Sequence, residues 1–136
     1  MRIEFQTAQE ADTVALSEVR FQSKGYWGYS PETLASWRPA MQITADCIRE
    51  HLVCNIYADG CLVGFYAITR GDPDLLDHLW LVPDVIGQGV GRAALEHITA
   101  SARQLGMRSR GIVSDADAEG FYLRHGAVKV GELFSA

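Results

Sequence analysis

The chain has 136 residues, 48% of them hydrophobic, and its formal net charge is −5. A chain of this length forms one domain and buries roughly two thirds of the surface that its unfolded form exposes, so we expect residues 1–136 to be a single domain. The acidic balance argues against a nucleic-acid partner, which needs clustered basic side chains, and no stretch approaches the roughly 18 apolar residues of a membrane span.

The N-terminal segment and the cysteines indicate a cytoplasmic protein. Residues 1–10 lack the basic region and the apolar stretch of a secretory signal. The cysteines are odd in number and form neither a CxxC pair nor a Cys/His cluster with the spacing of a zinc site; they are Cys47, Cys54 and Cys61. We therefore expect reduced thiols, no bound metal and a cytoplasmic location.

The first third of the chain predicts one strand and two helices. Residues 2–6 alternate in polarity as a short strand does, and a helix is expected to open at Thr7 and to end near Gly25. The apolar positions of this helix are Ala11, Val14, Ala15, Leu16 and Val19. Ser30 is a typical N-cap, and Pro31 a typical first residue, for a shorter second helix.

Three strand-like runs follow, at residues 51–58, 61–70 and 75–82. Asp59-Gly60 lies between the first two and is a strong signal for a two-residue hairpin turn, so these runs should pair antiparallel. The third run stops at Pro83, which cannot donate a hydrogen bond to a central ladder. The sequence therefore predicts a three-stranded meander.

The rest of the chain predicts two helices and two strands. A long helix should begin near Gly89 and end at Gly106 in a left-handed C-cap, with Ala94, Leu95, Ile98, Ala102 and Leu105 on its apolar face. A short strand at 110–114, a helix at 115–126 capped by Asp115 or Asp117, and a strand at 128–134 complete the chain. The predicted order is β-α-α-β-β-β-α-β-α-β, a mixed α/β sandwich.

Three glycines, Gly87, Gly89 and Gly91, lie between a strand end and a helix start. The first turn of a helix leaves amide N–H groups without intrahelical partners, and the helix dipole favours an anion there. Glycines let a phosphate approach the backbone without meeting a Cβ atom. This pattern predicts a pyrophosphate site, at which Arg92 either adds a charge-assisted contact or faces solvent.

Two other interpretations of these glycines remain open. They can form a tight turn that solves a packing problem. Residues 89–94 also satisfy the G-x-G-x-x-G/A fingerprint of dinucleotide-binding folds. Against that fingerprint, the unit follows a meander, and too few residues remain after it for a doubly wound sheet.

The run LWLVPDVIGQGVGRAAL, followed at the appropriate distance by AEGFYLRHGA, resembles motifs A and B of the GNAT superfamily of N-acetyltransferases. The resemblance covers nearly the whole chain. It implies the GNAT fold, a mostly antiparallel central sheet flanked by helices, although one strand of the family's C-terminal half is not found here. It also implies transfer of an acetyl group from acetyl-CoA to a primary amine of a small molecule or protein, without a metal.

The same resemblance implies a cofactor site. The pyrophosphate loop would comprise Gly87, Gln88, Gly89, Val90, Gly91 and Arg92, and Leu81 and Val82 would hydrogen-bond the pantetheine arm. Two positions depart from the family pattern: Ile86 replaces a Gln or Arg, and Asp117 replaces an Asn that often contacts the cofactor. These departures keep open a second hypothesis, a GNAT-fold sensor that binds an acyl-CoA without turnover.

Acetyl transfer needs an acid for the departing thiolate and a base for the ammonium. By resemblance the acid is Tyr122; the alternative is a packing role beside Phe121. Asp77 and His78 are the candidate bases, and strand alternation predicts that only one of them faces the substrate; a water chain could replace either. The backbone amide of Leu81 or Val82 would polarise the thioester carbonyl.

Aromatic residues are expected to form the acceptor pocket. They are Tyr26, Trp27 and Tyr29, between the first two helices, and Tyr66 from the central strand. Such rings can hold a cationic amine, at about 0.5–2 kcal/mol each, or can be the outer layer of the core. His51, His97 and His125 suggest no function, and His97 is expected on the polar face of its helix.

The C-terminal strand predicts a homodimer. Residues 128–134 would form an edge strand, whose unpaired backbone groups favour pairing with another chain. The alternative is a monomer whose short edge is protected by Lys129 and Glu132.

Overall fold

The computed structural model describes residues 1–71, 74–107, 111–113, 118–125 and 127. Its strands are β1 (Ile3–Thr7), β2 (Leu52–Ala58), β3 (Cys61–Thr69), β4 (Leu75–Leu81) and β5 (Gly111–Ile112). Its α-helices are α1 (Thr13–Gly25), α2 (Pro31–Trp37), α3 (Ala45–Glu50), α4 (Val90–Gln104) and α5 (Glu119–Arg124). Short 3₁₀ turns lie at Glu10–Asp12, Arg38–Met41 and Pro83–Val85.

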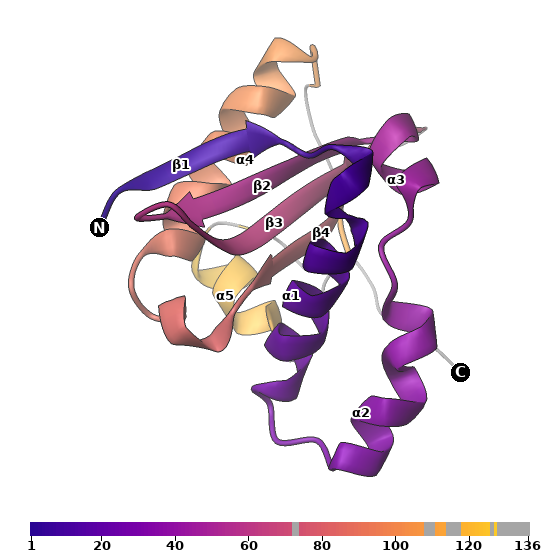
Figure 1. Cartoon of the computed structure of the whole chain (residues 1–136). Coiled ribbons are helices and arrows are strands. Elements are labelled where there is room, and N and C mark those ends of the chain that lie inside the picture. The colour runs from indigo at the N-terminus through magenta and orange to yellow at the C-terminus, as the bar shows by residue number, and fades with distance from the viewer. Residues whose placement is uncertain (72–73, 108–110, 114–117, 126, 128–136) are drawn as a thin grey trace.

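The described strands form one sheet in the order β1-β2-β3-β4-β5 (Figure 1). The pairs β1–β2, β2–β3 and β3–β4 are antiparallel, and β4–β5 is parallel. The β2–β3 connection is the predicted two-residue turn: Asp59 has φ 49° and Gly60 has φ 82°, as a turn that matches the strand twist requires. The mixed α/β class and the mostly antiparallel sheet are thus confirmed.

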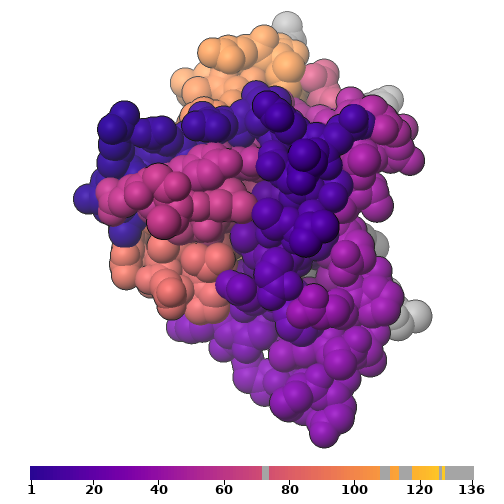
Figure 2. All heavy atoms as spheres, in the orientation of Figure 1, coloured from indigo at the N-terminus to yellow at the C-terminus, as the bar shows by residue number. Residues whose placement is uncertain are grey.

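Helices cover both faces of the sheet, because neighbouring strand residues point to opposite sides. Val53 and Phe65 belong to the core under α1 and α3, whereas Cys54 and Tyr66 belong to the core under α4 and α5. Figure 1 shows α1 and α4 on opposite sides of the strands. In Figure 2 the segment that carries α2 extends beyond the sheet, and α2 contains no buried residue.

The first helix begins later than predicted. Thr7 is the last residue of β1 and pairs with Cys54, so it does not open a helix. The chain then turns, and the Asp12 carboxylate accepts a hydrogen bond from the backbone N–H of Gln9 at 2.8 Å before α1 starts at Thr13. Ala11 therefore lies in the turn before α1, and Val14, in the first turn of α1, is 80% exposed, whereas Leu16 and Val19 are buried. The predicted end at Gly25 is correct.

Helix α3 was not predicted. Thr44 caps it, because its Oγ1 accepts a hydrogen bond from the N–H of Cys47 at 3.1 Å. Ile48 is its only buried residue, so the segment is too short and too polar for a helical hydrophobic period to be visible. The Ser30 cap and the start at Pro31 of α2 are confirmed by the bond that Ser30 accepts from the N–H of Thr33.

The predicted ends of α4 are correct. Gly89 is its N-cap with φ 86°, and Gly106 follows its C-terminus with φ 76°. Leu105 was expected on the buried face but is the C-cap and is 39% exposed. None of the helices in the described ranges is long and apolar enough to span a membrane.

Part of the C-terminal prediction can be compared with the structure. The strand expected at 110–114 is present as β5, over two residues, and α5 begins at Glu119 after Ala118 as N-cap. The proposed caps Asp115 and Asp117, and the strand expected at 128–134, lie outside the described residues.

Candidate active site

A cavity of about 750 Å³ opens beside β4. Among the described residues β4 pairs with β5 only at Leu75 and Leu76, so the rest of β4 presents an edge on that side. The cavity is lined by α1, β4, the glycine loop and α5. Nine residues predicted for the site reach it: Trp27, Asp77, His78, Leu81, Gly87, Gly89, Gly91, Arg92 and Tyr122.

The glycine loop has room for a ligand against its backbone. Gly87 and Gly89 have φ values of 81° and 86°, and a Cβ atom added at either would meet nothing within 4 Å. Gly89 caps α4, a helix of 15 residues, so the amides of the first turn and the positive end of the helix dipole are close by. Open space beside these amides fits the pyrophosphate of a coenzyme A molecule.

Gly91 has a different role from the other two glycines. A Cβ atom at this position would lie 3.0 Å from two ring carbons of Phe121 in α5. The missing side chain therefore allows α5 to pack against the start of α4. The packing interpretation holds for this glycine, while the open space is at Gly87 and Gly89.

The amides of Leu81 and Val82 face different sides of β4. The N–H of Val82 donates to the carbonyl of Val63 at 2.8 Å, so it is used within the sheet. Hydrogen-bonding directions alternate along an antiparallel strand, so the N–H of Leu81 faces away from β3, toward the cavity edge. Leu81 is therefore the better placed of the two to bond a ligand.

The remaining loop side chains stabilise the loop or face solvent. Nε2 of Gln88 donates to the carbonyl of Asp84 at 2.8 Å, and Val90 is fully buried. Nε of Arg92 lies 3.6 Å from Oε1 of Glu96, and both side chains are largely exposed. Asp117, the remaining predicted cofactor residue, lies outside the described part of the chain.

Asp77 and His78 line the same cavity, so the expectation that only one of them could face it is wrong. The cause is a β-bulge: Ile68 pairs with Leu76 and Ala67 pairs with His78, which leaves Asp77 without a partner on β3. A bulge interrupts strand alternation. Oδ2 of Asp77 consequently lies 3.8 Å from Nε2 of His78.

Tyr122 combines burial with access to the cavity. It is 7% exposed, belongs to the core under α4 and α5, and lines the cavity. Phe121 packs edge-on against it with ring centroids 5.3 Å apart. A phenol held in this way has a defined position relative to a ligand.

Of the four aromatic residues predicted for the acceptor pocket, Trp27 is the one that lines the cavity. Tyr26 packs edge-on against it and is 49% exposed, and Tyr29 packs against Trp37 with Nζ of Lys24 5.0 Å from its ring. Arg20 and Ser23 also line the cavity and were not predicted. Arg20 and Ser23 lie on α1 and Trp27 follows its C-terminus, and their spacing at i, i+3 and i+7 is the sequence signal that could have found them.

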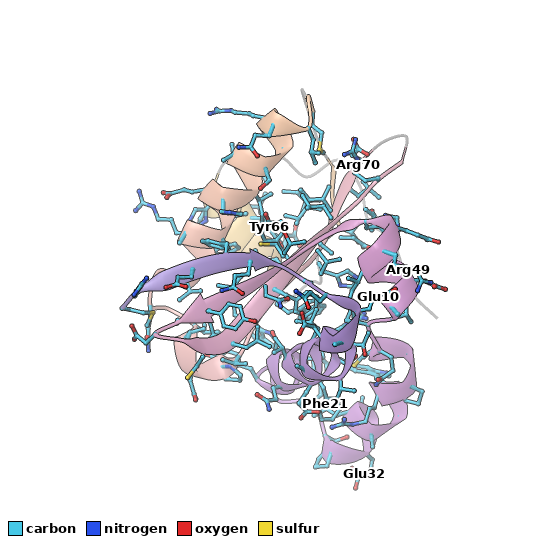
Figure 3. All side chains as sticks on the ribbon, turned by 45° about the horizontal axis from the view of Figure 1, so that its top comes forward. Glu10, Phe21, Glu32, Arg49, Tyr66 and Arg70 are labelled. Carbon is cyan, nitrogen blue, oxygen red and sulfur yellow. The ribbon has the colours of Figure 1, made fainter. Side chains whose placement is uncertain are left out.

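Tyr66 lies on the face of the sheet under α4 and α5, opposite to Phe65. It is 1% exposed, and its hydroxyl is 2.8 Å from Nδ1 of His97 in α4; Figure 3 shows its position near α4. His97 is therefore not on a polar helix face, because its ring also stacks on Phe5 at 4.0 Å. Burial raises the pKa of Tyr66 and lowers that of His97.

The cysteines and the other polar groups form no metal site in the described ranges. No three His, Cys, Asp or Glu residues gather there, and Cys47, Cys54 and Cys61 are free thiols. Glu10 and Arg49, side by side in Figure 3, form an exposed ion pair that links the turn before α1 to α3.

The model of the Acetyltransferase (GNAT) family matches residues 17–127. The chain belongs to this family. The match includes every predicted site residue, from Tyr26 to Tyr122. No curated protein sequence matches the chain at a significant level.

Solved structures share the fold over nearly the whole chain. PaiA N-acetyltransferase from Thermoplasma acidophilum, in complex with coenzyme A, has a TM-score of 0.73 and 21% identity, over 92% of this chain and 87% of that one. A GCN5-related N-acetyltransferase from Ralstonia eutropha has a TM-score of 0.77 and 14% identity, over 99% and 98%. A predicted acetyltransferase from Clostridium acetobutylicum, with acetyl-CoA, has a TM-score of 0.70 and 13% identity, over 99% and 96%.

Proposed function

We propose that this GNAT protein is an N-acetyltransferase that uses acetyl-CoA to acetylate a primary amine. The observation that carries the proposal is one cavity that contains the glycine loop at the start of α4, the exposed edge of β4, and Tyr122. Two of the similar structures contain coenzyme A or acetyl-CoA, which supports this choice of donor.

Each part of the cavity has a role in the proposed reaction. The amides at Gly87 and Gly89 bind the pyrophosphate, and the N–H of Leu81 holds the donor and polarises its carbonyl. The amine nitrogen attacks the thioester carbon, the C–S bond breaks, and Tyr122 gives its phenolic proton to the thiolate. Asp77 or His78 removes the proton from the ammonium, and Trp27 offers a ring face to a cation.

Binding and turnover together test this function. We expect the purified protein to bind acetyl-CoA, and to release the thiol of coenzyme A only when an amine from a panel of small amines, amino acids and peptides is present. Binding without turnover over the whole panel would favour an acyl-CoA sensor, which the departure at Ile86 leaves as the second candidate; Ile86 lines the same cavity. Binding of NAD in place of acetyl-CoA would contradict both.

We also propose a homodimer through residues 128–136, which lie outside the described part of the chain. The support is the expected edge strand at 128–134, whose backbone groups favour pairing with a second copy. Light scattering at micromolar concentration tests it: twice the chain mass is expected, and a strictly monomeric mass contradicts it.

A further inference from the structure

Trp80 and His78 are joined by a hydrogen bond that determines where the imidazole carries its proton. Nε1 of Trp80 lies 2.9 Å from Nδ1 of His78. An indole N–H can only donate, so Nδ1 is the acceptor in this bond. A neutral imidazole has a single N–H, and that proton is therefore on Nε2.

The protonated nitrogen of His78 faces Asp77. Oδ2 of Asp77 is 3.8 Å from Nε2, which is longer than a direct hydrogen bond and suits charge–dipole attraction or one bridging water. The Asp77 side chain is 38% exposed and that of His78 only 14%. The carboxylate is thus the more accessible of the two groups to a substrate in the cavity.

We propose that Trp80 holds His78 in the tautomer protonated on Nε2, so that Asp77 accepts the proton of the acceptor ammonium and His78 positions Asp77. This inference rests on the proposed function and divides the roles of the two candidate bases. With Nδ1 bonded to Trp80 and a proton on Nε2, the His78 ring has no lone pair with which to take a proton from the substrate. The bulge at Asp77 is what brings the carboxylate to the His78 side.

The proton transfer balances without any further reactant. The ammonium N–H bond breaks, its proton passes to a carboxylate oxygen of Asp77, and the nitrogen keeps the electron pair with which it attacks the thioester carbon. Asp77 then returns the proton to solvent. The Nε2–H of His78 orients the Asp77 carboxylate, and the negative charge of that carboxylate attracts the ammonium into reach for the transfer.

Charged and ionisable groups of two helices lie near Trp80 and Asp77. Arg20 of α1 has its guanidinium carbon 5.4 Å from the centre of the Trp80 ring. Burial raises the pKa of the Cys47 thiol in α3, Asp77 and Glu50 raise it further, and Arg20 lowers it. The Trp80→Phe substitution keeps an aromatic ring for Arg20 but removes the N–H donor together with part of the indole, so the tautomer of His78 in the wild type is the primary measurement.

The tautomer can be measured on the purified protein without any substrate. Long-range ¹H–¹⁵N NMR of the histidine rings distinguishes the two neutral tautomers, and the His78→Gln variant identifies the His78 signals by their loss. We expect the Nε2–H form in the wild type near pH 8 and a mixture of tautomers in Trp80→Phe. An Nδ1–H form or an imidazolium in the wild type would overturn the proposal, even if Trp80→Phe fails to fold.

Turnover separates the base from the positioning residue. Asp77→Asn should lower kcat/KM by about 100-fold or more, as loss of a general base does. His78→Gln keeps a donor near the position of Nε2 and should lose less than about tenfold, whereas His78→Ala should lose more, as removal of a supporting partner does. A His78→Gln variant as impaired as Asp77→Asn would make His78 the base and overturn the assignment. An inactive wild type that has the Nε2–H tautomer would contradict the proposed function and the role of Asp77, but not the Trp80–His78 bond.

Discussion

The hydroxyl of Tyr66 lies 2.8 Å from Nδ1 of His97 and 3.0 Å from Oγ of Ser101, in the layer between the sheet and α4. These three side chains connect the central strand β3 to α4, the helix that follows the glycine loop. Buried polar groups of this kind stabilise a structure only while every member keeps its partner. The network therefore links the stability of the fold to the position of the candidate cofactor site.

Removal of the Tyr66 hydroxyl should destabilise the protein. Tyr66→Phe leaves His97 and Ser101 without this partner in a buried layer, at a cost of about 1–3 kcal/mol. The free energy of unfolding in urea measures it. Tyr57→Phe is a suitable control, because the Tyr57 hydroxyl has only a 3.5 Å contact to Asn55 and should change stability by much less. Equal losses in the two variants would show that the network contributes nothing.

His97 should make the stability depend on pH. Burial lowers its pKa in the folded state from the ordinary value of 6.5, so the unfolded chain binds the proton first as the pH falls. The stability that neutral His97 contributes is complete above about pH 6.5 and is lost as the pH falls through the lower folded pKa. Urea unfolding of the wild type and of His97→Gln between pH 8 and pH 5 isolates the effect from the other histidines. A constant difference between the two proteins would contradict the prediction.

The sheet and the glycine loop could be predicted because their signals are local. Asp59-Gly60 sets the hairpin, Pro83 ends β4, and Gly106 ends α4, each through the backbone angles that the residue permits or the bond that it cannot make. The motif around Gly89 also predicted membership of the GNAT family, which the match over residues 17–127 confirms.

The face of the sheet to which each strand side chain points could not be predicted, because it depends on how the strands pair. The bulge at Asp77 arises from the register of β3 and β4, and it reverses the alternation on which the choice between Asp77 and His78 depended. Alternation does separate Phe65 from Tyr66, but only the packing of α1 and α4 determines that Tyr66 lies under α4. Helix α3 was missed because a single buried residue gives no period.

Substitution of Gly89 should weaken acetyl-CoA binding beyond its effect on folding. Gly89→Ala places a Cβ in the open space beside the first turn of α4 and forces a side-chain residue to φ 86°, at about 1–2 kcal/mol of strain. Gly106→Ala is a matched control at the other end of α4, with φ 76° and equally open surroundings. Both should lose similar stability, and only Gly89→Ala should raise the Kd for acetyl-CoA in a calorimetric titration. An equal change in Kd for both would remove the glycine loop from the binding site.

The contact between Gly91 and Phe121 should make a normally favourable substitution unfavourable. Alanine is normally preferred to glycine in a helix, by about 1 kcal/mol in the interior, but at Gly91 in the first turn of α4 its Cβ would lie 3.0 Å from the Phe121 ring. Gly91→Ala should therefore lower the Tm, and Phe121→Leu, which removes the contacting ring atoms, should cancel that loss in a double-mutant cycle. A Gly91→Ala protein more stable than the wild type would show that α5 moves aside without cost.

Loss of the Tyr122 hydroxyl should reduce turnover much more than binding. Protonation of the thiolate matters only as the C–S bond breaks, so an acid acts on kcat and leaves the affinity for acetyl-CoA nearly unchanged. Tyr122→Phe keeps the ring that packs in the core and should lower kcat by about 100-fold or more. Tyr57 does not line the cavity, so Tyr57→Phe is the control for loss of a tyrosine hydroxyl elsewhere in the protein. Full kcat in Tyr122→Phe at saturating acetyl-CoA and amine, in conditions where chemistry limits the wild type, would make Tyr122 a packing residue.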